Sequence, residues 1–265
     1  MRNQKNGKTL NGALFDLLRQ KILTGLLLPG RKLKVAELAA EHSVSLNVVR
    51  EALNRLAGEQ LVEIEPQCGF AVRGLSADDL ADLVHQRIIF EGIALRQSIG
   101  RGSLEWQSHV VAAHHRLSRT PMSRPEDKGK VNPDWMARHE EFNFVMMQAC
   151  GSPRLEQIVR QLAEAAAMYH RALLPAVGHA SELEAEHTEL LNAILAGDAD
   201  KAVRVLVAHL EQTRDMMLPV LLAAQPTESP TSTPRPHAGF GHSPVKRPVA
   251  RMASTKRRKE RYAAA

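Results

Sequence analysis

The stretch that decides the fold is Val44-Ser45-Leu46-Asn47-Val48-Val49-Arg50-Glu51-Ala52-Leu53-Asn54-Arg55-Leu56. At about 100° per residue, a helix gathers the apolar side chains on one face and the polar ones, Asn47, Arg50, Glu51 and Asn54, on the other. Ser45 is the expected N-cap, because its hydroxyl can accept a hydrogen bond from a first-turn N–H. The polar face offers amides and a guanidinium near a positive helix end. Such groups suit base edges and phosphates.

The segments on either side of this helix predict a small DNA-binding fold. Leucines spaced by three and four predict a helix over residues 9–24, which Gly25 and the Pro29-Gly30 turn end. A second helix, 35–41, is separated from the third by a short connection, as in a helix-turn-helix. Two short runs, 61–65 and 70–73, flank turn residues and predict a β-hairpin. Together these elements predict a winged helix-turn-helix domain over residues 9–74.

From Ser76 onward the sequence predicts an all-α helical bundle over residues 76–222, so the fold class is mainly α. Ser76 precedes two acidic residues, which favours a helix start. Ser181-Glu182-Leu183-Glu184 is a capping box that opens a later helix, and Gly197-Asp198 ends it. The other helices are expected at about 76–98, 104–118, 134–150, 153–174 and 199–222.

Net charge separates three regions of the chain. The total of +6 divides into +4 for residues 1–74, −5 for 75–222 and +7 for 223–265. A basic front beside an acidic middle fits a DNA-binding head on a body that does not bind DNA. The stretch 223–265 is rich in Pro, Ser and Thr and then basic, which predicts a disordered tail that adds non-specific attraction to DNA.

Targeting signals and disulfides are not expected. The two cysteines, Cys68 and Cys150, fall in different predicted domains, which excludes a disulfide framework and fits a reducing compartment. No apolar run reaches the ~20 residues of a membrane helix, and no signal-peptide core follows the N-terminal charges. The sequence therefore predicts a cytoplasmic protein without a membrane partner.

Candidate binding residues interrupt the apolar stripes of the bundle. Arg87 and Glu91 lie one turn apart within the stripe of the 76–98 helix, and His187 and His209 lie in the middle of two later stripes. His139 and Asn143, one turn apart, flank a third. Two interpretations remain open: hydrogen-bonded core residues with an internal ion pair, or side chains that converge on a ligand or metal, as in metal-binding bundles. Arg87 could also hold a small carboxylate with two hydrogen bonds.

The order and spacing of residues 9–74 resemble the DNA-binding domain of the GntR family of bacterial transcription regulators. The resemblance rests on Pro29-Gly30, Leu38-Ala39, Val49-Arg50-Glu51-Ala52-Leu53, Leu61-Val62 and Gly69. It implies a double-stranded operator as partner. The family usually has a DNA-contacting arginine where Leu46 stands. Lys34 or Asn47 could compensate for its absence, and the operator is expected to differ from the family's usual one. The expected DNA-binding residues are Lys34, Ser45, Asn47, Arg50, Asn54, Gln67 and Gly69.

Residues 76–215 resemble the FCD ligand-binding domain of the FadR-type branch of that family. The carriers are Arg87 with Glu91, then 139–143, Glu186-His187, 196–198 and 208–210. The resemblance implies a divalent metal, Zn²⁺ or Ni²⁺, held by an aspartate and three histidines, with a small organic acid completing the coordination. Here His139 stands at the aspartate position and Asn143 at the first histidine position. The expected metal ligands are His139, Asn143, His187 and His209, and the effector site adds Arg87. The alternative is a metal-free pocket in which the same groups bind an anion directly.

The leading prediction is therefore a dimeric, metabolite-responsive transcription regulator, a repressor whose effector relieves repression. It is not expected to be an enzyme, because no nucleophile-and-base set accompanies the histidines. The alternatives are a metal-dependent hydrolytic enzyme, with Glu140 or Glu141 as base, and an architectural DNA-binding dimer without an effector.

Overall fold

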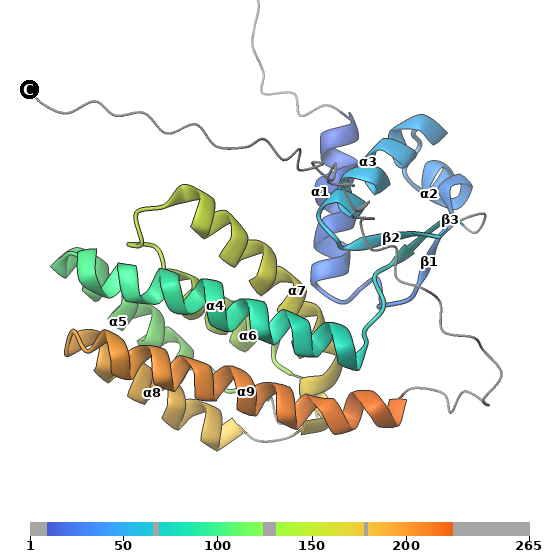
Figure 1. The fold of residues 1–265 in the computed structure, drawn as a ribbon. Helices are drawn as coiled ribbons and strands as arrows, with labels where there is room; N and C mark the ends of the chain where they lie inside the picture. Colours follow the sequence, from blue (N-terminus) through green and yellow to red (C-terminus); the bar gives the residue numbers. More distant parts are fainter. Residues whose placement is uncertain (1–9, 66–68, 124–130, 178–179, 225–265) are drawn as a thin grey trace, which may run out of the picture. The chain divides into compact units, whose positions relative to one another are not determined.

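The structure, a computed structural model, describes residues 10–65, 69–123, 131–177 and 180–224 (Figure 1). We call residues 10–72 the head. The head contains α1 (Leu10–Leu23), β1 (Lys32–Leu33), α2 (Val35–Glu41), α3 (Leu46–Gly58), β2 (Val62–Glu65) and β3 (Gly69–Val72). We call residues 77–224 the body. The body contains α4 (Ala77–Arg101), α5 (Leu104–Ser118), α6 (Pro133–Val145), α7 (Pro153–Val177), α8 (Ala180–Leu195) and α9 (Ala199–Ala224).

The head is the winged helix-turn-helix that the sequence predicted. The apolar stripe of α3 is fully buried against α1 and α2, and the Ser45 hydroxyl accepts a hydrogen bond from the Val48 N–H at 3.4 Å. The hairpin pairs β2 with β3 antiparallel, with Val62 opposite Val72. Strand β1 was not predicted. It pairs with the free edge of β3, so the sheet order is β1-β3-β2. Two residues are too few to show the alternation that identifies a strand.

The body is a helical bundle built around α4. This helix packs on α7 and α9, while α5 packs on α6 and α8 (Figure 1). Large apolar side chains such as Phe142, Leu95, Met146 and Leu206 are fully buried between the helices. Among the described residues, no helix is both long enough and apolar enough to cross a membrane.

Several predicted helix ends were wrong by a few residues. Helix α4 continues through Gly100 to Arg101, and the Gly102 N–H donates to the Ser98 carbonyl. Helix α7 continues through Pro175 to Val177. Helix α6 ends at Val145, and a series of tight turns connects it to Gly151, whose φ of +71° glycine adopts without strain. Helix α8 begins at Ala180, before the predicted cap, and the side chains of 181–183 lie outside the described set. Of the predicted tail, 223–265, the first two residues belong to α9, and 225–265 lie outside the described residues.

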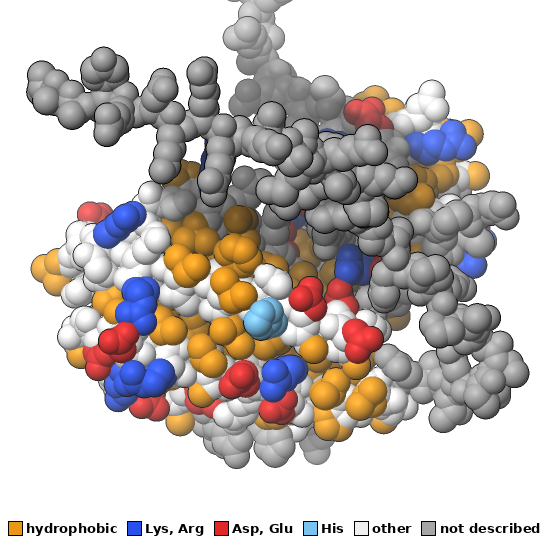
Figure 2. Space-filling view, in the orientation of Figure 1, with side chains coloured by type: hydrophobic (Ala, Val, Ile, Leu, Met, Phe, Trp, Pro, Cys, Tyr) orange, Lys and Arg blue, Asp and Glu red, His pale blue; other side chains and the backbone are white. Residues whose placement is uncertain are grey.

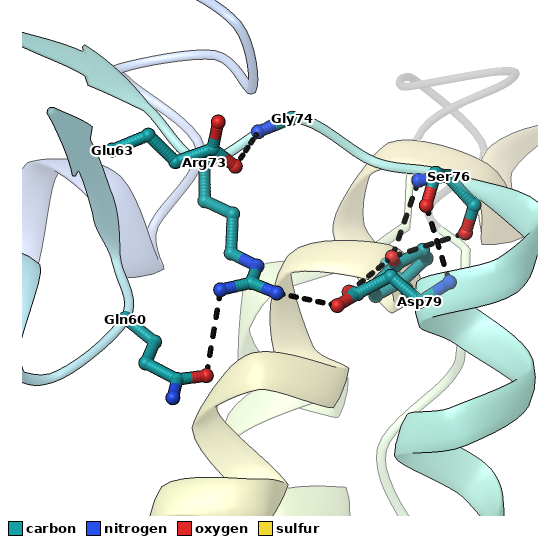
Figure 3. A network of polar contacts seen from close by, with 7 residues as sticks. Gln60, Glu63, Arg73, Gly74, Ser76 and Asp79 are labelled. Atoms are coloured by element: carbon teal, nitrogen blue, oxygen red, sulfur yellow. Dashed lines mark hydrogen bonds and ion pairs between the residues drawn. The ribbon is translucent and has the colours of Figure 1, made fainter. Parts of the chain in front are cut away.

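A polar network links the end of β3 to the start of α4 (Figure 3). Arg73 donates to the Asp79 carboxylate at 2.6 Å and to the Gln60 side chain at 3.4 Å. The Tyr169 hydroxyl, from α7, donates to the other Asp79 oxygen at 2.7 Å and accepts from the Ser76 N–H at 3.3 Å. Burial and the neighbouring carboxylate of Asp79 raise the pKa of Tyr169 well above its usual value, so the phenol keeps its proton. Asp79 and Arg73 therefore link the body to the segment 73–76, and Arg73 extends the network to Gln60 of the head.

Candidate functional site

The exposed face of α3 gathers the predicted DNA-contacting residues of that helix. Ser45, Asn47, Arg50 and Asn54 are all exposed, while the stripe on the opposite side is buried. The two arginines of α3 differ in their surroundings. The Arg55 guanidinium lies 3.9 Å above the Phe15 ring. Arg50 forms no hydrogen bond or ion pair with the described residues, so its guanidinium is available to a partner.

The other predicted DNA contacts lie on separate elements. Lys34 precedes α2, and its ammonium forms a 2.6 Å ion pair with Glu37. Gly69 opens β3 with φ of +98°, a left-handed conformation that favours glycine. Gln67 lies outside the described residues. The head thus presents one polar helix face, with Lys34 and Gly69 at separate points of the fold.

Three of the histidines singled out from the sequence converge inside the body. His139 comes from α6, His187 from α8 and His209 from α9, and one ring nitrogen of each lies within 4.8 Å of the others. All three side chains are buried. We call this set the histidine cluster. The ring centroids of His139 and His187 are 5.1 Å apart, and those of His187 and His209 are 5.0 Å apart.

Hydrogen bonds leave ring nitrogens of the cluster unused. His139 Nδ1 and His187 Nε2 are buried and have no hydrogen-bond partner among the described residues. Because an unsatisfied buried polar atom is costly, such atoms need an explanation, and a bound ion is one. His209 Nδ1 lies 2.6 Å from the Glu186 carboxylate. That carboxylate fixes a proton on Nδ1 and leaves Nε2 with its lone pair, the pattern of a histidine oriented for a metal.

The electrostatics keep His139 and His187 neutral. Burial lowers the pKa of His139 and His187 well below the usual value, and the neighbouring imidazoles lower it further. Neutral imidazole is the form that coordinates metals. The donor set therefore fits a transition-metal ion that accepts nitrogen ligands. Zn²⁺ and Ni²⁺ are such ions.

Asn143 lies beside the cluster as a neighbour of His139. Its side-chain nitrogen is 3.2 Å from His139 Nε2, the ring nitrogen opposite the unpartnered Nδ1. The contact holds the His139 ring in place. An amide that turned its oxygen to this nitrogen would accept a hydrogen bond from Nε2–H and leave Nδ1 free to coordinate.

Two further residues of the cluster's surroundings were missed from the sequence. His170, from α7, has its ring centroid 5.7 Å from that of His139, and burial followed by the Arg87 charge lowers its pKa to about 3. Trp135 stacks on His139 with ring centroids 5.0 Å apart and planes 9° from parallel. A signal for His170 was present, because its spacing of four from Ala166 and three from Leu173 puts it on the buried face of α7.

The Arg87 guanidinium is paired with a carboxylate of its own helix. Its Nε and Nη2 atoms donate to the two oxygens of Glu91 at 2.6 and 3.3 Å, and both side chains are buried. The cavity that Arg87 lines with His139 and His170 measures about 30 Å³, room for one water molecule. The internal ion pair foreseen for Glu91 is confirmed.

A larger cavity of about 310 Å³ is lined by a different set of residues, which includes His187 of the cluster. His187 and Trp135 connect it to the cluster, and His114 and Glu184 supply further polar groups. Hydroxyl and apolar side chains complete the wall: Leu117, Ser118, Thr120, Pro121, Met122 and Ser123. No Lys or Arg is among these described lining residues. Burial lowers the pKa of His114, so it adds no fixed positive charge at neutral pH.

Comparison with known proteins gives the same two parts. The family model for bacterial regulatory proteins of the gntR family matches residues 10–72, and the model for the FCD domain matches residues 82–212. The chain is 33% identical over 208 residues to the HTH-type transcriptional regulator BphR of Paraburkholderia xenovorans, which covers 78% of this chain and 85% of the relative. It is 29% identical over 200 residues to the HTH-type transcriptional repressor GlaR of Escherichia coli, covering 74% and 90%.

Solved structures share the fold. A putative GntR regulator from a Rhodococcus species matches with a TM-score of 0.66 at 23% identity, covering 82% of this chain and 99% of that one. The Escherichia coli protein McbR/YncC matches with a TM-score of 0.64 at 20% identity, covering 81% and 99%. With both family models and a relative at this identity over most of its length, the chain belongs to the GntR family of bacterial transcription regulators and carries the FCD effector-binding domain of that family.

Proposed function

We propose that the head binds an operator through the exposed face of α3, with Arg50 as the strongest contact and Asn47 and Asn54 at base edges. The availability of the Arg50 guanidinium supports this role. A guanidinium can donate two hydrogen bonds to one guanine, and an amide can pair with an adenine. Ser45, Lys34, Gly69 and Gln67 would contact the backbone. A regulator of this kind acts in the cytoplasm, where the DNA is.

Arg50→Ala tests this proposal, with Arg55→Ala as matched control. Both variants remove one positive charge from α3, but only Arg50 is proposed to touch a base. On an operator selected with the wild-type protein, we expect Arg50→Ala to weaken binding by about 5- to 150-fold, equivalent to ~1–3 kcal/mol, and to relax the sequence preference. Arg55→Ala should change affinity by less and keep the preference. Equal losses measured by fluorescence anisotropy would contradict the assignment.

We propose that the histidine cluster holds one divalent metal ion. The single observation that carries this proposal is the pair of unpartnered buried nitrogens, His139 Nδ1 and His187 Nε2, beside a histidine oriented by Glu186. His139, His187 and His209 would be the protein ligands, and Asn143 would orient His139 rather than bind the ion. Three neutral nitrogen ligands leave coordination positions for an effector.

Competition with a chromophoric chelator measures the metal directly. We expect the wild-type protein to bind one equivalent of Zn²⁺ or Ni²⁺ and His187→Ala to bind none. His114→Ala, which removes a nearby imidazole outside the cluster, should still bind one equivalent. Glu186→Gln should weaken metal binding by about 10- to 100-fold, the usual effect of removing a carboxylate behind a metal-bound histidine. Stoichiometric binding by His187→Ala would refute the site.

We propose that a small organic acid binds in the 310 Å³ cavity and reaches the metal past His187. The volume of this cavity lies at the lower end of the range found for small-molecule sites. Because its described walls carry no Lys or Arg, the metal would supply the positive charge that a carboxylate needs. Arg87, held by Glu91, would then act on the site through its charge and not as the carboxylate anchor.

A thermal-shift screen of di- and tricarboxylates, run with and without Zn²⁺, tests that arrangement. An acid that binds should raise the melting temperature of the zinc-loaded protein and leave the metal-free protein unchanged. An equal shift in both would favour direct binding of the anion by the histidines. Absence of any effect on operator affinity would favour an architectural protein.

We propose further that the protein is a homodimer that represses transcription until the effector binds, without catalytic turnover. Ile89 and Ile93 are exposed one turn apart on α4, and Figure 2 shows hydrophobic side chains gathered on the face where α4 lies. Burying such a patch against a second copy is favourable. Light scattering should show a dimer that Ile93→Glu dissociates, while Val111→Glu, an exposed site on α5, leaves it intact.

A further inference from the structure

Leu46 is the one large apolar side chain on the exposed face of α3. It is the first residue of the helix and keeps 46% of its surface exposed, whereas Leu53 and Leu56 of the same helix are fully buried. The head core therefore does not use Leu46. Its side chain is therefore available to a partner of α3 outside the head.

The helical spacing places Leu46 in line with the base-reading residues. Leu46, Arg50 and Asn54 follow one another at intervals of four, so they share one ridge of the helix. Four residues rise about 6 Å along the axis, and successive base pairs rise about 3.4 Å. The side chain of Leu46 thus addresses a base pair about two steps from the one that Arg50 addresses.

The chemistry of the major groove gives an apolar side chain one favourable target. Of the base edges in that groove, only thymine presents a methyl group, and apolar side chains recognise it by contact. Phosphates and the hydrogen-bonding edges of guanine, adenine and cytosine offer leucine nothing and would lose water. Leu46 cannot serve as a backbone contact for the same reason.

We propose that Leu46 reads the 5-methyl group of a thymine in each operator half-site, about two base pairs from the position read by Arg50. The proposal rests on the proposed function of α3 as the recognition helix. It makes Leu46 a specificity-determining residue that favours thymine.

Deoxyuridine tests the contact, because it differs from thymidine only by the missing methyl group. An operator is first selected from a random library with the full-length wild-type protein. Each thymine of a half-site is then replaced by deoxyuridine in turn. We expect one position at which the replacement weakens binding about fourfold, the value of one buried methyl group at ~0.8 kcal/mol.

The same scan with Leu46→Ala completes a double-mutant cycle. This variant should bind the thymidine and deoxyuridine operators equally at that position, while its discrimination elsewhere is unchanged. Alanine favours the helix, so α3 should still form. Leu28→Ala is the matched control, because Leu28 is an exposed leucine of the head outside α3 and should keep the fourfold effect. A second selection with Leu46→Arg should replace thymine by guanine at that position.

The outcomes distinguish a failure of the proposed function of the head from a failure of the contact proposed for Leu46. If the wild-type protein selects no sequence, the proposed function of the head fails. If it selects an operator but no thymine shows a methyl effect that depends on Leu46, the contact proposed for Leu46 is wrong. The proposal would also be overturned if Leu46→Ala weakened binding but neither the wild-type protein nor the variant distinguished thymidine from deoxyuridine operators.

Discussion

Two ion pairs, one in the head and one in the body, have the same shortest distance but opposite surroundings. Lys34, which precedes α2, and Glu37 on α2 approach to 2.6 Å, with side chains 68% and 69% exposed. Arg87 and Glu91 on α4 also approach to 2.6 Å, with side chains 6% and 2% exposed. Water and salt screen the first pair, whereas in the second, buried pair each charge has the other as its counter-charge. Burial, not distance, decides what such a pair does for the protein.

The same contrast separates the two functional regions. The polar residues of α3 are exposed and have hydrogen-bonding capacity to offer DNA. The histidine cluster is buried. His209 Nδ1 is paired with Glu186, whereas His139 Nδ1 and His187 Nε2 have no partner among the described residues. The exposed face of α3 is thus open to a large external partner, whereas the buried histidine cluster has room only for a small one. Three variants and one change of pH test how burial changes the contribution of a polar group to stability.

Glu91→Gln should have the largest effect. It leaves the Arg87 charge buried without a counter-charge, which costs about 3–5 kcal/mol in the free energy of unfolding. Urea unfolding followed by circular dichroism measures this. The double variant Arg87→Met/Glu91→Leu should recover most of the loss, because an apolar pair needs no charge compensation. A double variant less stable than Glu91→Gln would contradict the assignment of the cost to unpaired charge.

Acidification should have the next largest effect. The folded state holds the pKa of His170 at about 3, below the usual 6.5, so the unfolded chain binds more protons in the window between these values. Stability therefore falls as the pH drops below 6.5, by about 2 kcal/mol at pH 5 from His170 alone. His139 and His187 shift in the same direction and add to the loss. His170→Gln should flatten the pH dependence measured on metal-free protein, and an unchanged slope would exclude His170 as a source.

Tyr169→Phe should cost about 1 kcal/mol. It removes the hydroxyl that joins Asp79 and Ser76, but Asp79 keeps its contact with Arg73. Asp79→Asn in the same background should then cost less than it does in the wild-type protein, because the two residues share one contact. Strictly additive costs would show that the phenol and the carboxylate do not depend on each other.

Glu37→Gln should have the smallest effect, within about 0.5 kcal/mol in the free energy of unfolding. The difference from the wild-type protein should shrink further in 0.5 M salt. If Glu37→Gln destabilised the head as much as Glu91→Gln destabilises the body, the contrast between exposed and buried pairs would fail.

The sequence was sufficient to predict the head, because its information is local. The stripe of Val49, Ala52, Leu53 and Leu56 predicted the buried face of α3 and by exclusion the exposed one. The Ser45 cap and the hairpin also depend on neighbouring residues. The exception is β1, whose two residues gain their conformation from pairing with β3 and not from any pattern of their own.

The body was predictable helix by helix, but its site was predictable only in part. Each apolar stripe could be read along one helix, and the histidines within the stripes could be named. Their distances could not, because the cluster depends on how α6, α8 and α9 pack. The role of Glu186 and the choice between the 30 Å³ and 310 Å³ cavities depend on the same packing.

The stacking of Trp135 on His139 has a practical consequence. The chain has two tryptophans, Trp106 and Trp135, and both belong to the body. The indole of Trp135 also lines the larger cavity. Its emission intensity should therefore report a metal bound by His139 or an effector in the cavity, over a background from Trp106 alone. A fluorescence titration can therefore follow metal or effector binding in the unlabelled protein, even when the head is bound to DNA.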